Sequence, residues 1–538
     1  KGWRVTVLEK LGGFGGRAGV WRQDGFTFDA GPTIVTAPFM LEELWSLCGR
    51  RFADDVTLVP TNPFYRIRYD DGTHFDYGND AQANREQIRR ISPADLPGYE
   101  RFVAEAEMCY RLGFEQLGAI AYDSLGDLVR AAPSLIRMRG WRSLYGLVSS
   151  HMAHPKLRVA FSLQSLLIGG NPFNVTGIYS LINALERRYG VHWAMGGTGA
   201  LVSAFVRLLE SRGVCVRSHA EVRRIHVEHG RATGVELAGG ERLAADIVVS
   251  NADTAWTYRH LVAPEHRSHW TDTRIESKKY SMSLFVWYFG TKRQYPQVPH
   301  HTMVLGPRYE GLLEDIFERH HLPDDFSLYL HRPTATEPGM APAGHDGFYA
   351  LSPVPHLASG TDWAGTAEAY RQRIEQRLAS TVLPGLGQHI VTSRVTTPQD
   401  FHDQLLSYKG AAFGMEPLLV SPLSRFPQGK PITLSEGILF LTYATLRSDD
   451  RGERVSRVKQ IVEWLGSDFD GVIIFDEAHA MQNAAGGKGE RGDVVASQQG
   501  RAGLRLQHAL PNARIVYVSA TGATTVHNLA YAQRLGLW

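Results

Sequence analysis

Hydrophobic and polar positions alternate at the start of the chain and then give way to a glycine-rich turn. Residues 4–9, Arg-Val-Thr-Val-Leu-Glu, carry β-branched residues in alternation and predict a strand that ends at the acidic Glu9. A turn over residues 12–17 follows, then a hairpin-like stretch over residues 26–32 and a helix predicted to begin near Pro38. This order favours an α/β nucleotide-binding unit entered at its second strand.

The periodicity changes several times farther along the chain. Residues 83–190 have mostly helical spacing, and α/β patterning returns afterwards, with a helix predicted from residue 197 to 209. The continuous apolar run at residues 246–251 predicts a buried strand. The aromatic strand at residues 283–289 either lines an apolar substrate tunnel or is a half-buried core strand. A new α/β pattern starts after Pro422, with strands at 438–443, 471–475 and 514–518 and a helix at 453–465.

These changes divide the chain into five predicted segments. Two of them, residues 1–82 and 191–277, form the two parts of a discontinuous dinucleotide-binding domain. Residues 83–190 form a helical insertion, residues 278–420 a substrate domain, and residues 423–538 a further, partial α/β domain.

Composition and charge exclude several classes of protein. The 538 residues are 43% hydrophobic and 21% charged, which is typical of a globular chain and not of a disordered one. The net charge of +2 gives no overall field to attract nucleic acid. Three separated cysteines support neither a zinc site nor a disulfide framework, and no signal sequence or membrane-length apolar run is present. A reducing cytosol is therefore predicted.

The first turn has the composition of a nucleotide site. A carboxylate at the end of the second strand, such as Glu9, binds ribose hydroxyls in doubly wound sheets. Glycines let the backbone approach a pyrophosphate, and an arginine can pair with it, which makes Gly15, Gly16 and Arg17 candidates. The alternative is a surface loop whose glycines only permit a tight turn.

Read together, the motifs resemble those of the amino-oxidase-like flavoproteins and, within them, the phytoene desaturases. They comprise Val-Thr-Val-Leu-Glu, Gly-Gly-Arg and Phe-Asp-Ala-Gly-Pro near the start. Gly-Val-His-Trp-Ala-Met-Gly-Gly at 190–197, Val-Ser-Asn-Ala-Asp at 249–253, His-Arg-Pro-Thr at 331–334 and Leu-Ser-Pro-Val-Pro at 351–355 continue the pattern. The resemblance covers residues 1–420 and implies an α/β fold: a truncated Rossmann-like FAD-binding domain with a helical and mixed α/β substrate domain.

The resemblance implies an oxidoreductase that transfers hydride from a linear C40 carotenoid precursor to FAD. It places Glu9 on the ribose, Gly15, Gly16 and Arg17 near the pyrophosphate, Gly31 and Pro32 near the flavin, and the Val222 backbone near the adenine. No catalytic residue can be assigned, and the number of desaturation steps, the electron acceptor and the oligomeric state stay open.

A carotenoid substrate also implies a place in the cell. Because this substrate is stored in lipid, we expect a cytoplasmic enzyme associated peripherally with the inner membrane. The arginines and apolar residues of segment 125–150 are one candidate docking face, and an ordinary solvated helix is the alternative.

Two parts of the flavoprotein pattern are missing from this sequence. The first strand with its G-x-G-x-x-G loop would precede Lys1, and the closing glycine-rich flavin segment would follow residues 413–417. We therefore expect this chain, with both ends of the enzyme cut, to hold FAD poorly.

The last segment carries a different signature. An apolar strand ends in Asp476 and Glu477, as a Walker B strand does, and a second strand ends in Ser-Ala-Thr at 519–521. Residues 423–538 resemble the first RecA-like domain of the strawberry notch helicase-like family, with Asp476 and Glu477 as a vestigial Mg-ATP site. No G-x-x-x-x-G-K-[ST] loop precedes Asp476, so ATP hydrolysis is not expected. A nucleic-acid partner is implied only under this alternative, and we interpret the chain as a fusion joined between Glu416 and Arg425.

Overall fold

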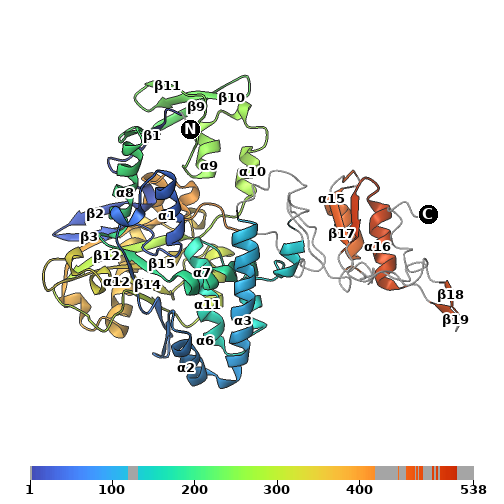
Figure 1. Cartoon of the computed structure of the whole chain (residues 1–538), viewed down its shortest axis with the longest axis horizontal. Coiled ribbons are helices and arrows are strands. Elements are labelled where there is room, and N and C mark those ends of the chain that lie inside the picture. Colours follow the sequence, from blue (N-terminus) through green and yellow to red (C-terminus); the bar gives the residue numbers. More distant parts are fainter. Residues whose placement is uncertain are drawn as a thin grey trace. The chain divides into compact units, whose positions relative to one another are not determined.

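The chain divides into two compact units, Lys1–Leu418 (unit 1) and Leu419–Trp538 (unit 2) (Figure 1). The structure is a computed structural model. It describes residues 3–118, 131, 133–418, 446, 456–466, 468–469, 472–475, 487–489, 492–494 and 497–517.

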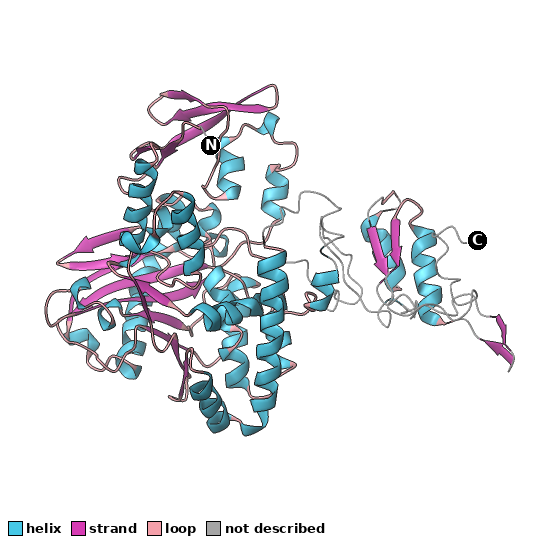
Figure 2. Cartoon of the chain, in the orientation of Figure 1, coloured by secondary structure: helices cyan, strands magenta, loops and turns pink. Residues whose placement is uncertain are grey.

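A mixed seven-stranded sheet forms the centre of unit 1. Its strand order is β16-β12-β15-β14-β13-β5-β6, and the pair β13–β5 is the parallel one while the other neighbours are antiparallel. The strands span β5 Tyr65–Arg68, β6 His74–Tyr77, β12 Ser283–Thr291, β13 His301–Val304, β14 Leu328–His331, β15 Asp346–Val354 and β16 Ile390–Thr396. The fold is therefore mixed α/β, as predicted, and Figure 2 shows these strands among the surrounding helices.

Helices surround this sheet, and the segment predicted to be a helical insertion supplies many of them. They are α1 Pro38–Leu47, α2 Ala81–Ile91, α3 Leu96–Cys109, α5 Leu144–Ser149, α6 Pro155–Ala160, α7 Leu181–Tyr189, α8 Gly197–Ser211, α10 Asp272–Ser277, α11 Tyr309–Phe317, α12 Trp363–Thr381 and α13 Pro398–Asp403. Helix α1 begins at the proline from which it was predicted, because Pro at the first helical position loses no hydrogen bond there.

Strand β12 is buried along its whole length, and its alternate residues pack into two different hydrophobic clusters. Leu284, Val286 and Tyr288 belong to the larger cluster of the molecule. Phe285, Trp287 and Phe289 belong to a second cluster that includes the buried face of α12. The prediction of a half-buried strand is wrong, because β12 lies between β16 and β15 with packed side chains on both faces.

Strand β1 (Thr6–Leu8) confirms the first predicted strand, and it pairs in parallel with β8 (Cys215–Arg217). The predicted strand at residues 246–251 is wrong. These residues belong to no strand, and Ile247 is 60% and Val249 87% exposed. A strand needs a neighbour for its N–H and C=O groups, and the described residues supply none here.

Smaller sheets complete unit 1. A three-stranded antiparallel sheet has the order β11-β10-β9, and it stands apart from the central sheet in Figure 1. The bounds are β2 Val20–Gln23, β3 Phe26–Asp29, β4 Leu58–Pro60, β7 His192–Ala194, β9 Val222–Glu228, β10 Arg231–Leu237 and β11 Arg242–Ala244. The hairpin lies earlier than predicted: β2 and β3 form it over residues 20–29, and only residues 26–29 of the predicted stretch 26–32 belong to it. Strand β4 pairs with β7.

Unit 2 has parallel strands β17 (Val472–Phe475) and β20 (Arg514–Tyr517), with helices α15 (Arg457–Leu465) and α16 (Gln498–Ala509). Strands β17 and β20 match two predicted strands. Strands β18 (Gly487–Gly489) and β19 (Gly492–Val494) form a short antiparallel hairpin.

Several predictions for the tail lie outside the described residues. These are the strand at 438–443, residues 453–455 of the predicted helix, Asp476, Glu477 and residues 519–521. Among the described residues, no helix is long and apolar enough to cross a membrane.

Candidate functional site

The predicted glycine turn packs directly against the loop that follows the β2–β3 hairpin. Gly15 and Gly16 have positive φ values of 118° and 52°, and residues Gly16–Ala18 form a short 3-10 helix. A Cβ on Gly31 would lie 1.8 Å from the carbonyl oxygen of Arg17, so only glycine fits there. The space beside Gly16 is open, since a Cβ built on it would meet no heavy atom within 4 Å. The backbone at Gly31 therefore packs tightly against the backbone at Arg17, while the turn at Gly16 stays accessible.

Arg17 reaches from this turn to two distant segments. Its Nη2 donates a hydrogen bond of 2.5 Å to Oγ of Ser407 and lies 3.8 Å from Oδ2 of Asp253. Among the described residues this is the one hydrogen bond of its guanidinium, so other N–H groups stay available to an anion. Burial lowers the pKa of Arg17, an effect that Asp253 opposes, and burial raises the pKa of Asp253.

Pro32 is exposed, and the residue after it ties the loop to the central sheet. The Pro32 carbonyl accepts a hydrogen bond from Oγ1 of Thr198 at the start of α8. Oγ1 of Thr33 lies 3.0 Å from the hydroxyl of Tyr329 on β14 and 3.1 Å from that of Tyr349 on β15. The Gly31–Pro32 segment is therefore anchored on both sides.

Glu9 follows β1 directly and lies close in the fold to Val222. The backbone N–H of Glu9 donates to the Arg217 carbonyl at 2.9 Å, and its own carbonyl accepts from Ala220 at 2.8 Å. Its Oε1 accepts the N–H of Leu11 at 2.8 Å, which fixes the side chain at the start of the glycine turn. Val222 begins β9 only two residues beyond Ala220.

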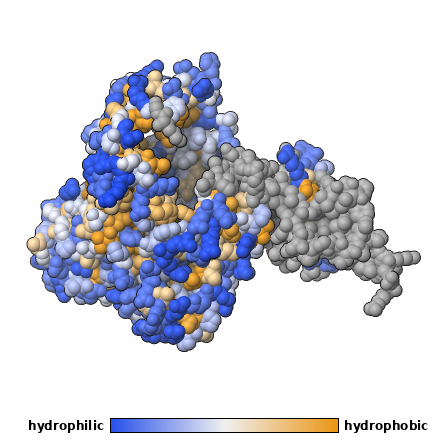
Figure 3. Space-filling model, viewed as in Figure 1, coloured by the Kyte–Doolittle hydropathy of each residue, from blue (hydrophilic) through white to orange (hydrophobic). Residues whose placement is uncertain are grey.

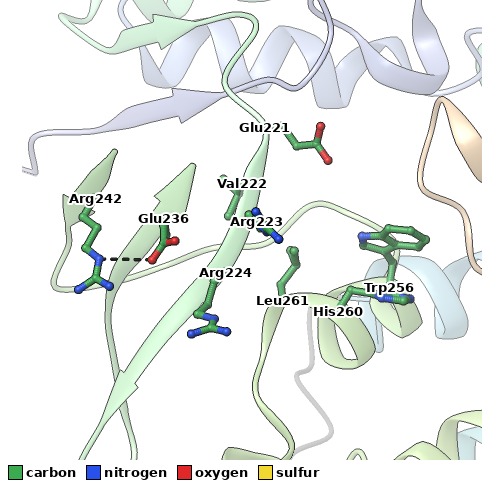
Figure 4. A pocket seen from close by; sticks show the side chains of 9 residues that line it. All are labelled: Glu221, Val222, Arg223, Arg224, Glu236, Arg242, Trp256, His260 and Leu261. Carbon is green, nitrogen blue, oxygen red and sulfur yellow. Dashed lines mark ion pairs between the residues drawn. The ribbon is translucent and has the colours of Figure 1, made fainter. Parts of the chain in front are cut away.

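Val222 lines a cavity of about 510 Å³ between the small sheet and the helical segment after Asp253 (Figure 4). Its walls comprise Glu221, Val222, Arg223, Arg224, Glu236, Arg242, Trp256, His260 and Leu261. The rings of Trp256 and His260 lie with centroids 4.0 Å apart at an interplanar angle of 30°, and Arg242 lies 3.3 Å from Glu236. Trp256 ends helix α9 (Thr254–Trp256), which Asp253 caps through a 2.9 Å bond to the Trp256 N–H. Asp253 therefore lies near Arg17 and also caps the helix that contributes Trp256 to the cavity wall.

A second glycine-rich turn, at the start of α8, is closed by two carboxylates that were not predicted. Oδ1 of Asp29 accepts from the N–H of Gly199 at 3.4 Å, and Oε2 of Glu337 accepts from that of Gly196 at 2.8 Å. Burial, with a contribution from Glu337, raises the pKa of Asp29 to about 7, and its Oδ2 has no hydrogen-bond partner. This helix N-terminus binds acidic side chains, so it is not a free phosphate site.

The structure thus brings the predicted residues of unit 1 into two adjoining groups. Arg17, Gly15, Gly16, Gly31 and Pro32 form one group, and Glu9 and Val222 belong to the other. Asp253 and Ser407 were not singled out by the sequence. Asp253 could have been noticed as the acid closing the Val-Ser-Asn-Ala-Asp motif, whereas Ser407 offers no local signal.

Comparison with known proteins identifies the family. Residues 1–428 match the family model described as flavin containing amine oxidoreductase. The chain belongs to this family. Residues 403–538 separately match the model described as P-loop containing NTP hydrolase pore-1.

Several relatives within the flavin containing amine oxidoreductase family are close in sequence. A "Phytoene desaturase (neurosporene-forming)" of Cereibacter sphaeroides is 47% identical over 425 residues, or 78% of this chain and 82% of the relative. A "Phytoene desaturase (lycopene-forming)" of Pseudescherichia vulneris is 44% identical over 77% of this chain and 85% of its own length. A "zeta-carotene-forming phytoene desaturase" of Myxococcus xanthus is 34% identical over 77% and 80%.

Replacing Gly31 by Ala tests the contact between the two loops. The added Cβ meets the Arg17 carbonyl at 1.8 Å, so the turn must move and FAD retention should be lost. The measurement is the amount of FAD released per chain after reconstitution with excess FAD and desalting. Gly339→Ala is the matched control, because its Cβ would meet no heavy atom within 4 Å. Full retention in Gly31→Ala would show that the contact does not matter for the cofactor.

Asp29→Asn should remove a pH dependence of stability. The pKa of Asp29 is about 7 in the folded protein against a usual 3.8, so the folded state binds an extra proton between these values. Stability should therefore fall as pH rises through this window, by about 1.4 kcal/mol for each unit of pKa difference. Asn keeps the acceptor for Gly199 without the charge, and its stability should change less between about pH 5 and pH 8. Chemical unfolding at both pH values measures this, with Asp24→Asn in the exposed β2–β3 turn as the control; equal pH slopes in both variants would contradict it.

Proposed function

We propose that this protein is an FAD-dependent phytoene desaturase that removes hydrogen from a linear carotenoid precursor. The observation that carries the proposal is the 40–47% identity to phytoene desaturases over about four fifths of the chain. The relatives form different products, neurosporene, lycopene and zeta-carotene by their descriptions, so the number of desaturation steps is left open.

The arrangement of unit 1 fits FAD along a path from the cavity to the Gly31 loop. Val222 and Trp256 would bind the adenine, and Glu9 would bind the ribose. The open space beside Gly16 and the available N–H groups of Arg17 would take the pyrophosphate. Gly31 and Pro32, held against Arg17 and Thr198, would lie near the flavin ring.

Bound FAD would supply the redox chemistry, as the acceptor of a hydride from the polyene. The residues of the chain orient the substrate and exclude water. A hydrocarbon offers no polar group, so recognition must come from apolar area alone. The face of β12 that carries Leu284, Val286 and Tyr288 shares its cluster with Phe28 of the hairpin before Gly31, and it is the better candidate for the substrate side of this strand.

Association with a membrane surface follows from the substrate and has support in helix α1. Met40, Leu44 and Leu47 are 48%, 45% and 76% exposed, and their i, i+4, i+7 spacing puts them on one face of α1. In Figure 3, hydrophobic residues colour part of the face of unit 1 that is turned to the viewer. Such a face can enter the lipid interface. The segment predicted from the sequence, 125–150, is less suited where it is described, since Nε of Arg139 lies 3.6 Å from Oε1 of Glu105.

A second candidate function concerns unit 2. Its support is the match of residues 403–538 to an NTP hydrolase family, together with the parallel strands β17 and β20. An ATP-dependent, strawberry notch-like activity would need Asp476 and Glu477, directly after β17, to hold Mg-ATP.

The deciding experiment is a desaturation assay on the purified full chain. FAD, phytoene in liposomes and a quinone acceptor are supplied, and products are separated by chromatography. We expect carotenoids with longer conjugation, and no ATP hydrolysis in a parallel assay with and without nucleic acid. An ATPase without desaturation would favour the second candidate, and a protein inactive in both assays would refute both.

Arg17→Ala should weaken FAD retention, because the substitution removes the cation placed for the pyrophosphate. Loss of one charged hydrogen-bonding group costs about 1.5–3 kcal/mol, a Kd increase of roughly tenfold to a hundredfold. Fluorescence titration with FAD measures it. Arg22→Ala, on the exposed side of β2, is the control. Equal affinities in the two variants would remove Arg17 from the site.

A further inference from the structure

Three histidines meet at one end of the pair β13–β14, next to Tyr329, whose hydroxyl also contacts Thr33 of the Gly31 loop. His301 and His331 are directly opposite each other in the antiparallel register, and His300 precedes β13. Each offers one imidazole nitrogen, and these nitrogens all lie within 4.8 Å of one another. The three residues are at most 4% exposed. Three imidazoles are thus enclosed together in the interior.

The hydrogen bonds of the cluster leave nitrogens directed at one another. Nδ1 of His300 lies 2.6 Å from Oγ1 of Thr336, and Nδ1 of His301 lies 2.6 Å from the Tyr329 hydroxyl. On the inner side, Nε2 of His300 lies 3.0 Å from Nε2 of His331. Nε2 of His301 is fully buried and has no hydrogen-bond partner. A buried polar atom without a partner lowers the stability of the folded state, and a bound ligand at this nitrogen would remove that cost.

The chemistry of the three side chains suits a metal ion. The three side chains are buried, which disfavours the charged form of an imidazole, and a neutral imidazole has one nitrogen with a lone pair for a metal ion. Two nitrogens bound to tetrahedral Zn²⁺ at about 2.05 Å lie about 3.3 Å apart, close to the distance between His300 and His331. The outer nitrogens bonded to Thr336 and Tyr329 would fix the ring orientations, as the outer partners of metal-binding histidines commonly do.

A carboxylate and a cation near the cluster are already paired with each other. Asp346 is fully buried, and its Oδ2 accepts from Nε of Arg332 at 2.9 Å and from the Tyr295 N–H at 2.6 Å. The Trp193 ring covers His300 and His331 with centroid distances of 4.9 and 5.3 Å. The three imidazoles are therefore the metal-binding groups of this region that no charged side chain already pairs with.

We propose that His300, His301 and His331 bind one divalent transition-metal ion, with Zn²⁺ as the best-fitting ion, through their Nε2 atoms. The ion replaces the hydrogen bond between His300 and His331, and each outer nitrogen keeps a proton for Thr336 or Tyr329. It would join β13 to β14 and to the residue before β13, and a water molecule would complete its four ligands. Imidazole donors favour zinc, copper and nickel over magnesium and calcium.

The test is the metal content of the full chain, purified through a tag without histidines after expression with added Zn²⁺. Elemental analysis should find about one Zn²⁺ per chain in the wild type. His331→Gln and His300→Gln should lose it. His356→Gln should keep it, because His356 belongs to a separate pair with His320, their rings 4.6 Å apart. Metal that persists in His331→Gln would belong to another part of the chain and would overturn the proposal.

A second measurement needs no substitution and covers variants that fold badly. The wild-type chain, expressed with Co²⁺ in place of Zn²⁺, should show the visible absorption of cobalt with nitrogen ligands, and added Zn²⁺ should remove it. A wild-type protein that contains less than about a tenth of an ion per chain and gives no cobalt spectrum refutes the site, because a buried structural zinc site is fully occupied. The histidines would then form a hydrogen-bonded cluster only.

Discussion

The contact between Gly31 and the Arg17 carbonyl is the constraint on which the site of unit 1 depends. It presses the glycine turn after β1 against the loop after the β2–β3 hairpin, at a separation that excludes any side chain on residue 31. Each loop is then held from its other side: Arg17 by Ser407 and Asp253, and the Gly31 loop by Thr33 with Tyr329 and Tyr349. The segments around Asp253, Tyr329, Tyr349 and Ser407 thereby take fixed positions around these two loops.

This arrangement connects the three-stranded sheet of unit 1 to its seven-stranded sheet, which suits a dinucleotide. The cavity at Val222 lies at the small sheet, while the Gly31 loop is bonded to the large sheet. Asp253 caps the helix that contributes Trp256 to the cavity and also faces Arg17. A cofactor with an adenine at one end and a flavin at the other would therefore bridge both sheets.

The local sequence pattern predicted the helices and strands near the site well. It predicted their burial and strand pairing less well. The strand before Glu9, the helix at Pro38 and the helix after Gly197 follow from alternation, proline position and glycine punctuation. The run at 246–251 failed because apolar composition reports a tendency to be buried but not the presence of a neighbouring strand. The prediction that β12 is half-buried was wrong. Its aromatic residues point to both faces, and both faces of this central strand are buried.

The groups missed by the sequence are those assembled over long separations. Ser407 meets Arg17 across 390 positions, Glu337 meets the Gly196 N–H across 141, and His331 meets His300 across 31. No window of local sequence contains any of these three pairs. The contact between the histidines follows from the strand order, because β14 and β13 are neighbours, whereas the other two contacts join residues outside the strands.

The unbroken pairing of β12 with β15, from Ser283–Val354 to Thr291–Asp346, has a consequence for how this enzyme can change over evolution. The residues from Leu284 to Phe289 alternate between two packed clusters, and a shift by one position would exchange them. Natural or laboratory variation that alters chain length or product should therefore accumulate in loops and helix ends, while the strand itself is inherited nearly unchanged.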